Sequence, residues 1–262
     1  MAAPIDFNGA YSQQFDTLAT TGTTNAWANG ETVPGWYLFN KANGSPVLTY
    51  RANSGGANTG AIYSFGSDGA TERAIGGVGS GSFEGYIALA ATNATGATVN
   101  ALTLRFDGEQ WRNGGNATAQ TMTLEYGIGT TFADVTTWTP AGSAFNWSSP
   151  VVGTSPAPVD GNVAGRVTDV GGTLSGLGWA NGATLWLRWV EVNDSGNDHG
   201  LAIDNVSLTA GGGADVCTPP AGTTSGSSDA STAIALDANW MVVGDDEANL
   251  LRIYPRAGGA AV

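Results

Sequence analysis

The stretch that decides the fold is Val99-Asn-Ala-Leu-Thr-Leu-Arg-Phe-Asp107, in which apolar and polar side chains alternate. In an extended chain, successive side chains point to opposite faces. One face would carry Leu102, Leu104 and Phe106, and the other would carry Thr103, Arg105 and Asp107. This period of two predicts a strand with one buried face and one face in water, as in an antiparallel sandwich.

Residues 121–128 repeat the pattern, with Met122, Leu124, Tyr126 and Ile128 on the apolar side. Further runs rich in β-branched and aromatic residues lie at 47–51, 61–65, 85–89, 184–192 and 201–208. Clusters of Gly, Asn and Ser separate them, and no stretch keeps a helical period. We therefore expect an all-β fold, an antiparallel β-sandwich of jelly-roll type, over residues 1–210.

The sequence changes character after this region. Residues 211–231 are rich in Gly, Pro and Ser and read as a linker. Residues 232–262 form a β segment with three short apolar runs, at 232–236, 240–243 and 250–254. Some thirty residues bury too little surface to fold alone. We expect this segment to begin a second, incomplete domain, through which an oligomer could also form. The alternative is that it lends its strands to the sandwich.

The composition limits the classes of partner. The 262 residues carry 9 Lys and Arg against 22 Asp and Glu, for a net charge of -13. Such a surface repels nucleic acid and anionic membranes. No apolar run is long enough to span a membrane. The single cysteine, Cys217, rules out a disulfide within the chain. Abundant Gly, Thr, Ser and Asn are typical of secreted bacterial β-proteins, so we expect an extracellular or cell-surface location.

An acidic loop, residues 193–205, is the first candidate site. Its carboxylate and amide oxygens are the ligands that calcium prefers, although the EF-hand spacing is absent. Asp16 joins the candidates because pairing of the terminal strands would bring it beside this loop. The alternative is a loop whose carboxylates accept hydrogen bonds from backbone amides. The expected calcium ligands are Asp16, Asp194, Asn197, Asp198 and Asp204.

The only histidine, His199, lies in the same loop. One imidazole and one distant cysteine cannot form a tetrahedral His/Cys zinc set. Serine-histidine-aspartate chemistry would depend on this one side chain. We therefore expect His199 to be a structural hydrogen-bonding group and the protein to have no catalytic site.

A second candidate site is Glu109, Trp111 and Arg112, which follow the decisive strand. Three interpretations stay open. Glu109 could be half of a glycosidase pair with Asp107 or Glu191. The three residues could bind a sugar, with the indole as a stacking platform. They could also form a hydrogen-bonded turn that shapes the end of the sandwich. Five further tryptophans lie in loop-like surroundings and could stack on ligands or fill the core: Trp27, Trp36, Trp138, Trp147 and Trp179.

Several segments together resemble a known module. They are residues 11–18, 34–37, 50–52 and 63–66, the GEQWRNGG run at 108–115, and the acidic loop. In this order they resemble the N-terminal β-sandwich module of secreted bacterial multidomain proteins, found ahead of endonuclease/exonuclease/phosphatase-type, lamin-tail and surface-anchored domains. The resemblance implies a noncatalytic module. Residues 233–262 resemble the start of a secreted propeller-like family of unknown function.

The expected function is that of a noncatalytic, calcium-stabilised binding or surface-assembly module at the front of a larger secreted protein. Its partner would be a glycan or a neighbouring protein subunit. Two alternatives stay open: an accessory domain of a secreted nuclease or phosphatase, and a structural subunit of an extracellular layer or filament.

Overall fold

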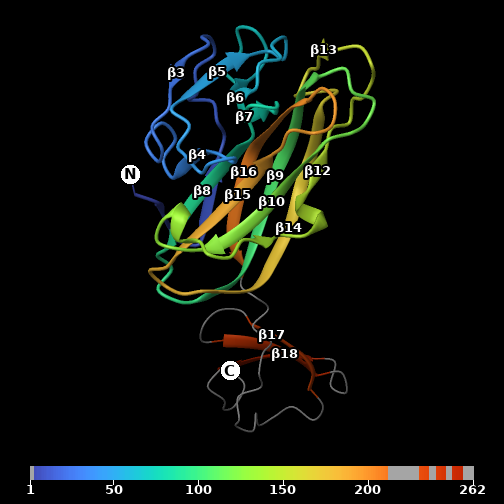
Figure 1. Cartoon of the computed structure of the whole chain (residues 1–262). Helices are drawn as coiled ribbons and strands as arrows, with labels where there is room; N and C mark the ends of the chain where they lie inside the picture. The colour runs from blue at the N-terminus through green and yellow to red at the C-terminus, as the bar shows by residue number, and fades with distance from the viewer. Residues whose placement is uncertain (1–2, 212–229, 236–239, 246–249, 256–262) are drawn as a thin grey trace. The chain divides into compact units, whose positions relative to one another are not determined.

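The chain divides into two compact units, Met1–Ala210 and Gly211–Val262. This division is seen in a computed structural model that describes residues 3–211, 230–235, 240–245 and 250–255 (Figure 1). Most of the expected linker, residues 212–229, lies outside the described residues.

The first unit contains two sheets. In the seven-stranded sheet the order is β1 (Ile5–Phe7), β8 (Gly85–Asn93), β15 (Thr184–Glu191), β10 (Thr121–Ile128) and β11 (Thr139–Pro140). Two more strands pair with this path, β4 (Trp36–Asn40) with β8 and β12 (Trp147–Ser148) with β10. Two short 3-10 helices lie in the connections, at Phe132–Asp134 and Ser143–Phe145.

The second sheet of this unit has nine strands. Their order is β13 (Ala157–Pro158), β9 (Val99–Asn113), β16 (Gly200–Gly211), β7 (Ala74–Val78), β6 (Ala61–Phe65), β5 (Thr49–Asn53) and β3 (Asn25–Ala26). The long strand β14 (Arg166–Trp179) pairs with β9, and β2 (Ala10–Gln13) pairs with β16. Figure 1 shows β9, β14 and β16 as the longest arrows of the unit.

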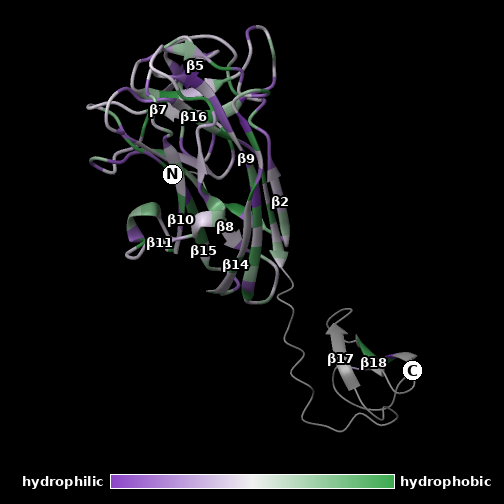
Figure 2. Ribbon diagram, turned by 90° about the vertical axis from the view of Figure 1, so that its right-hand side faces the viewer, coloured by the Kyte–Doolittle hydropathy of each residue, from purple (hydrophilic) through white to green (hydrophobic). Residues whose placement is uncertain are grey.

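One hydrophobic core joins the two sheets, which confirms the predicted β-sandwich. The nine-stranded sheet contributes Leu102, Leu104 and Phe106, which are at most 1% exposed. The facing sheet contributes Trp36, Leu124 and Trp189 to the same cluster. The alternation predicted for 121–128 holds except at Ile128, the last residue of β10, which is 43% exposed and lies outside the core. In Figure 2 the apolar residues lie mainly along the strands of the sandwich.

Charged side chains also pair across the outer face of the seven-stranded sheet. Glu125 and Arg188 face each other in β10 and β15, with 2.6 Å between Oε2 and Nη2. The Arg188 guanidinium also lies over the rings of Tyr86 and Trp138, at 4.2 and 3.8 Å from their centres. Such opposite pairs on neighbouring strands stabilise a sheet. Arg105 instead pairs with Asp169, with 3.7 Å between Nε and Oδ1.

A one-residue irregularity in β16 decides which way its polar residues point. Asn205 has a φ of 50°, in the left-handed region that Asn adopts more readily than most residues. Leu201 and Ile203 before it, and Val206 and Leu208 after it, all reach the core. The alternation of core-facing and outward-facing side chains along β16 therefore shifts by one residue at Asn205. Asp204 lies on the outer face, on the same side as Ala202 of a separate cluster.

The second unit contains a three-stranded antiparallel sheet in the order β17 (Ala230–Ala235), β18 (Trp240–Asp245) and β19 (Leu250–Pro255). The three expected strands therefore form a sheet of their own. Met241, Val243 and Tyr254 pack together on one side of it. Leu236, expected at the end of the first strand, lies outside the described residues. No helix among the described residues is long and apolar enough to cross a membrane.

The shared core makes a first prediction. Phe106→Ala should lower the free energy of unfolding by about 3–5 kcal/mol, because it removes a buried ring and leaves a cavity. That ring packs edge-on against Trp189, with ring centres 5.5 Å apart. Leu48→Ala is the control, since Leu48 is 69% exposed and should change the value by less than about 0.5 kcal/mol. Urea unfolding followed by tryptophan fluorescence measures both. If Phe106→Ala and Leu48→Ala lowered the free energy of unfolding equally, Phe106 would not be part of a core that joins the two sheets.

Candidate functional site

A polar pocket of about 280 Å³ lies where the acidic loop meets the ends of β7 and β9. Five stretches of the chain line it, and most of their contacting residues are glycines or polar residues. The lining residues are Asn58, Val78, Gly79, Ser80, Gly81, Arg112, Gly114, Pro156, Asn193, Gly196, Asn197 and Asp198. We call this the loop pocket.

Hydrogen bonds within the acidic loop and from neighbouring segments hold it in shape. Asp198 Oδ1 accepts a hydrogen bond from the Asp194 backbone N–H at 2.7 Å. The Asn197 carbonyl accepts from the side-chain amides of Asn116 at 3.2 Å and Gln120 at 3.0 Å. This arrangement matches the alternative in which loop carboxylates accept from backbone amides. Burial raises the pKa of both Asp194 and Asp198.

His199 anchors the end of this loop. It is fully buried, and its Nδ1 accepts a hydrogen bond from the Gly114 N–H at 2.9 Å. Nε2 then carries the proton and faces the Thr118 carbonyl at 3.3 Å. Burial lowers the pKa of His199, which favours the neutral ring. Both ring nitrogens therefore have structural partners, as expected for a noncatalytic histidine.

Glu191 lies behind the loop and is 3% exposed. Burial raises its pKa well above the ordinary value, and the negative charges of Asp198 and Asp194 raise it further. A hydrogen bond from the Gly79 backbone opposes this shift. Its Oε2 has no hydrogen-bond partner among the described residues. Burial, and secondarily the neighbouring carboxylates, therefore favour the protonated form of Glu191.

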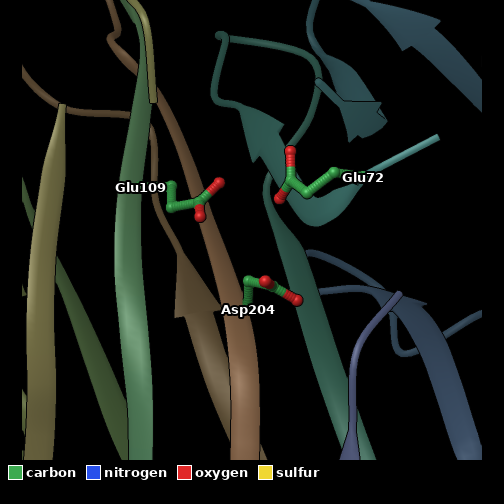
Figure 3. Close-up of side chains that lie close together, drawn as sticks. All are labelled: Glu72, Glu109 and Asp204. Atoms are coloured by element: carbon green, nitrogen blue, oxygen red, sulfur yellow. The ribbon is translucent and has the colours of Figure 1, made fainter. Parts of the chain in front are cut away.

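A second group of carboxylates lies on the outer face of the nine-stranded sheet. Glu72, Glu109 and Asp204 each bring one carboxylate oxygen within 4.8 Å of the others. Glu109 projects from β9, Asp204 from β16, and Glu72 from the turn before β7. Figure 3 shows the carboxyl groups of Glu72 and Glu109 facing each other, with Asp204 beside the space between them. We call this the carboxylate cluster.

The cluster is deeply buried. Glu109 is 0% and Asp204 is 3% exposed. Burial raises the pKa of Glu109 to about 8, although the Trp111 Nε1–H donates to its Oε2 at 2.9 Å. Burial likewise raises the pKa of Asp204 to about 6, against backbone hydrogen bonds from Asn205 and Phe15. Glu72 is half-buried and accepts from the Asn162 amide at 2.6 Å.

The structure does not bring the five expected calcium ligands together at one place. Asn197 and Asp198 line the loop pocket, whereas Asp204 belongs to the carboxylate cluster. Residues 200–204 are extended, so at about 3.3 Å per residue β16 carries Asp204 about 13 Å beyond the loop. The expectation that all five residues form one calcium site is therefore wrong, because Asp204 lies too far from the loop.

Asp16 behaves differently from the other four expected ligands. Its Oδ1 accepts from the Arg73 backbone N–H at 3.0 Å. The expected pairing of the terminal strands is present, since β2 pairs with β16. Phe15 therefore reaches Asp204 through its backbone N–H, and the negative charge of Asp16 contributes to raising the pKa of Asp204.

The second expected site is divided as well. Arg112 lines the loop pocket and donates through Nη1 to the carbonyls of Gly55 and Gly56, at 3.0 and 3.1 Å. Trp111 is 1% exposed and lies parallel to Phe65. The interpretation of Glu109, Trp111 and Arg112 as a sugar platform does not fit this arrangement, because the buried Trp111 ring, packed against Phe65 and Gly161, cannot stack on a ligand. Four of the five loop tryptophans are also buried, namely Trp27, Trp36, Trp147 and Trp179, while Trp138 is half-buried.

No protein-family model and no curated protein matches the sequence. Among solved structures, the chain is similar to two cleaved adhesin domains of Lys-gingipain. For the K2 domain the TM-score is 0.40 at 11% identity, covering 77% of this chain and 98% of that one. For the K3 domain from Porphyromonas gingivalis w83 it is 0.41 at 11% identity, covering 69% and 96%.

A third similar structure is the N-terminal cellulose-binding domain of β-1,4-glucanase C from Cellulomonas fimi. Its TM-score is 0.33 at 15% identity, with 70% of this chain and 91% of that chain covered. Values this low assign no ligand and no activity to the chain described here.

Glu191 makes a prediction about pH. The pKa of Glu191 in the folded protein lies well above its ordinary value of 4.5, so the folded protein keeps a proton that the unfolded chain releases as the pH rises. Its contribution to stability is therefore fully present below pH 4.5 and is lost as the pH rises above it. The urea midpoint of Glu191→Gln should fall less between pH 4 and pH 8 than that of the wild type. Glu109 and Asp204 titrate in both proteins, so the difference isolates Glu191. If the urea midpoints of the wild type and Glu191→Gln changed in parallel with pH, the raised pKa of Glu191 would be contradicted.

Proposed function

We propose that residues 1–210 are a noncatalytic binding module of a secreted or cell-surface protein, and that the loop pocket binds a glycan. The observation that carries this proposal is the convergence of Asn58, Ser80, Arg112, Asn193, Asn197 and Asp198 on one small pocket. The alternative of an accessory domain beside a secreted nuclease or phosphatase has no observation in its favour among the described residues.

The chemistry of the pocket suits a neutral, hydroxyl-rich ligand. Side-chain amides both donate and accept hydrogen bonds, a carboxylate accepts them and a guanidinium donates them. Sugar hydroxyls also do both, so they can satisfy this mixture. The net charge of -13 disfavours a polyanionic ligand. The volume of about 280 Å³ lies just below the range typical of drug-sized ligands, which suits a short sugar unit.

The buried state of the acidic residues supports a noncatalytic role. A glycosidase needs two carboxyl groups that reach the substrate. Glu109 and Glu191 are at most 3% exposed. Asp107 is bound by Arg166, with 2.5 Å between Oδ2 and Nη2. None of the three is placed to protonate or attack a sugar in the loop pocket.

The pocket predicts a specific loss of binding. Asn58 and Asn197 are exposed, and no side-chain hydrogen bond holds either of them within the described residues. Their double alanine variant should fold normally but bind a recognised glycan about tenfold more weakly, because one or two neutral hydrogen bonds are lost. A glycan array followed by calorimetry tests this, and the glycan should be recovered chemically unchanged.

The control for this experiment is Asn8→Ala, an exposed asparagine outside the pocket. Equal binding by the wild type and the double variant would place the ligand elsewhere, and cleavage of the glycan would contradict a noncatalytic module.

A second function, surface assembly, is favoured by the sheet of the second unit. Trp240 and Ile253 are 36% and 41% exposed. In the pairing of β18 with β19, Val242 lies opposite Ile253, so Trp240 and Ile253 share one face of this small sheet. Neighbouring exposed apolar side chains of this size often mark a contact with another protein.

This second proposal predicts a change in oligomeric state. The full chain should form dimers or larger assemblies at micromolar concentration, and Trp240→Ser with Ile253→Ser should shift it toward the monomer. Leu48→Ser, which changes a more exposed apolar residue of the first unit, should leave the assembly unchanged. Light scattering after size-exclusion chromatography measures the mass. A monomeric wild type over the tested concentrations would exclude assembly through this face.

A further inference from the structure

We infer that Glu72, Glu109 and Asp204 bind a calcium ion that ties β9 and β16 to the turn before β7. This inference does not depend on the loop pocket or on its ligand. It also differs from the site expected in the acidic loop, because it uses Asp204 together with two residues that were not expected as metal ligands.

The spacing of the three carboxylates suits calcium. Calcium binds oxygen ligands at about 2.3–2.6 Å, so two ligands on opposite sides of the ion lie about 4.6–5.2 Å apart. One oxygen from each of the three side chains lies within 4.8 Å of the others. One ion can therefore contact all three without a rearrangement of the strands that carry them.

Two buried oxygens of the cluster point to a missing partner. Glu109 Oε1 and Asp204 Oδ1 are inaccessible to solvent and have no hydrogen-bond partner among the described residues. Glu109 as a whole is 0% and Asp204 3% exposed. Buried carboxylates in proteins are almost always paired, hydrogen-bonded or bound to a metal. A cation between them supplies the partner that both oxygens lack.

The nearby arginines cannot take this role, because other groups already hold them. Arg166 donates to Asp107 through Nε and Nη2. Arg73 donates from Nε to the Ser64 hydroxyl at 2.9 Å and from Nη2 to the Ser64 carbonyl at 2.7 Å. Among the described residues, the three carboxylates therefore face one another without an ion pair to either arginine.

The donor set selects the class of ion. Zinc sites in proteins use mainly cysteine and histidine. Every ligand in this cluster is a carboxylate oxygen, and both ring nitrogens of His199 are engaged elsewhere. Calcium accepts six to eight oxygen ligands in irregular geometry, whereas magnesium requires a near-octahedral shell and usually keeps several waters. A deeply buried, three-carboxylate site therefore favours calcium over magnesium.

The experiment uses the full chain after treatment with chelator. At a hundredfold excess over its Kd, calcium should raise the melting temperature by about 5–10 °C, and magnesium should raise it much less. Terbium should also bind and luminesce when tryptophan is excited, because the Trp111 indole is hydrogen-bonded to Glu109 at 2.9 Å. Trp111→Phe should reduce this luminescence, and Trp138→Phe should not.

Variants locate the ion. Glu109→Gln keeps the shape of the side chain and should weaken calcium binding at least about 100-fold, since even outer-shell partners cost 10–100-fold. In chelator it should melt no lower than the wild type, because an uncharged amide of similar shape replaces a buried acid that is costly to ionise. Glu72→Gln, at a half-buried position, gives a second test if Glu109→Gln does not fold. Asp198→Asn should leave the calcium effect unchanged.

Three results would overturn the inference. They are a melting temperature that does not respond to calcium, a response that survives in both Glu109→Gln and Glu72→Gln, and a response abolished by Asp198→Asn alone. The last would place the ion in the acidic loop instead. Stabilisation by magnesium or zinc in preference to calcium would contradict the choice of ion.

Discussion

The Asp107 carboxylate holds together the part of the sandwich that positions the carboxylate cluster. Its oxygens accept from the Arg166 guanidinium, from the Asp169 backbone N–H at 2.9 Å and from the Asn205 amide at 3.0 Å. Asp169 and Asn205 are the described non-glycine residues with positive φ, so one carboxylate stabilises both left-handed positions. Burial would raise the pKa of Asp107, but these hydrogen bonds and the charge of Arg166 lower it. By fixing Asn205, Asp107 also fixes the phase of β16 that turns Asp204 toward Glu109.

Local pattern predicted the strands that face the core. Residues 61–65 and 121–128 are strands with the expected limits, because their apolar residues alternate or cluster and clear turn signals surround them. The long strand β14 was not predicted, since Val170-Gly-Gly-Thr-Leu-Ser-Gly-Leu shows neither apolar alternation nor β-branched enrichment. Its position comes from pairing with β9 over most of its length. A glycine-rich strand of this kind is specified by its neighbour and not by its own sequence.

The sites were predicted less well than the fold, for a related reason. The polar face of β9 was expected to lie in water, but Trp111 on that face packs with Tyr63, Phe65 and Ala202 in a cluster outside the main core. This second layer is built by segments far apart in sequence, so periodicity within one strand cannot reveal it. Glu72 was missed because the strand that follows it, β7, has a Gly76-Gly77 pair and no strand pattern in its sequence. Only the folded chain brings Glu72 beside Glu109. The structural role of His199, by contrast, followed from its being the only histidine.

The carboxyl groups around the loop pocket and those of the carboxylate cluster are both costly to ionise. Around the loop pocket, Asp194, Asp198 and Glu191 have raised pKa values, chiefly through burial, and in the cluster Glu109 and Asp204 do as well. Carboxylates in both places therefore lack enough donors or positive charge within the described residues. In the pocket, Asp198 is only half-buried, so hydroxyl donors of the proposed glycan would reach it from solvent. In the cluster, Glu109 Oε1 and Asp204 Oδ1 are buried without a hydrogen-bond partner among the described residues, and the proposed calcium ion would be shared by both.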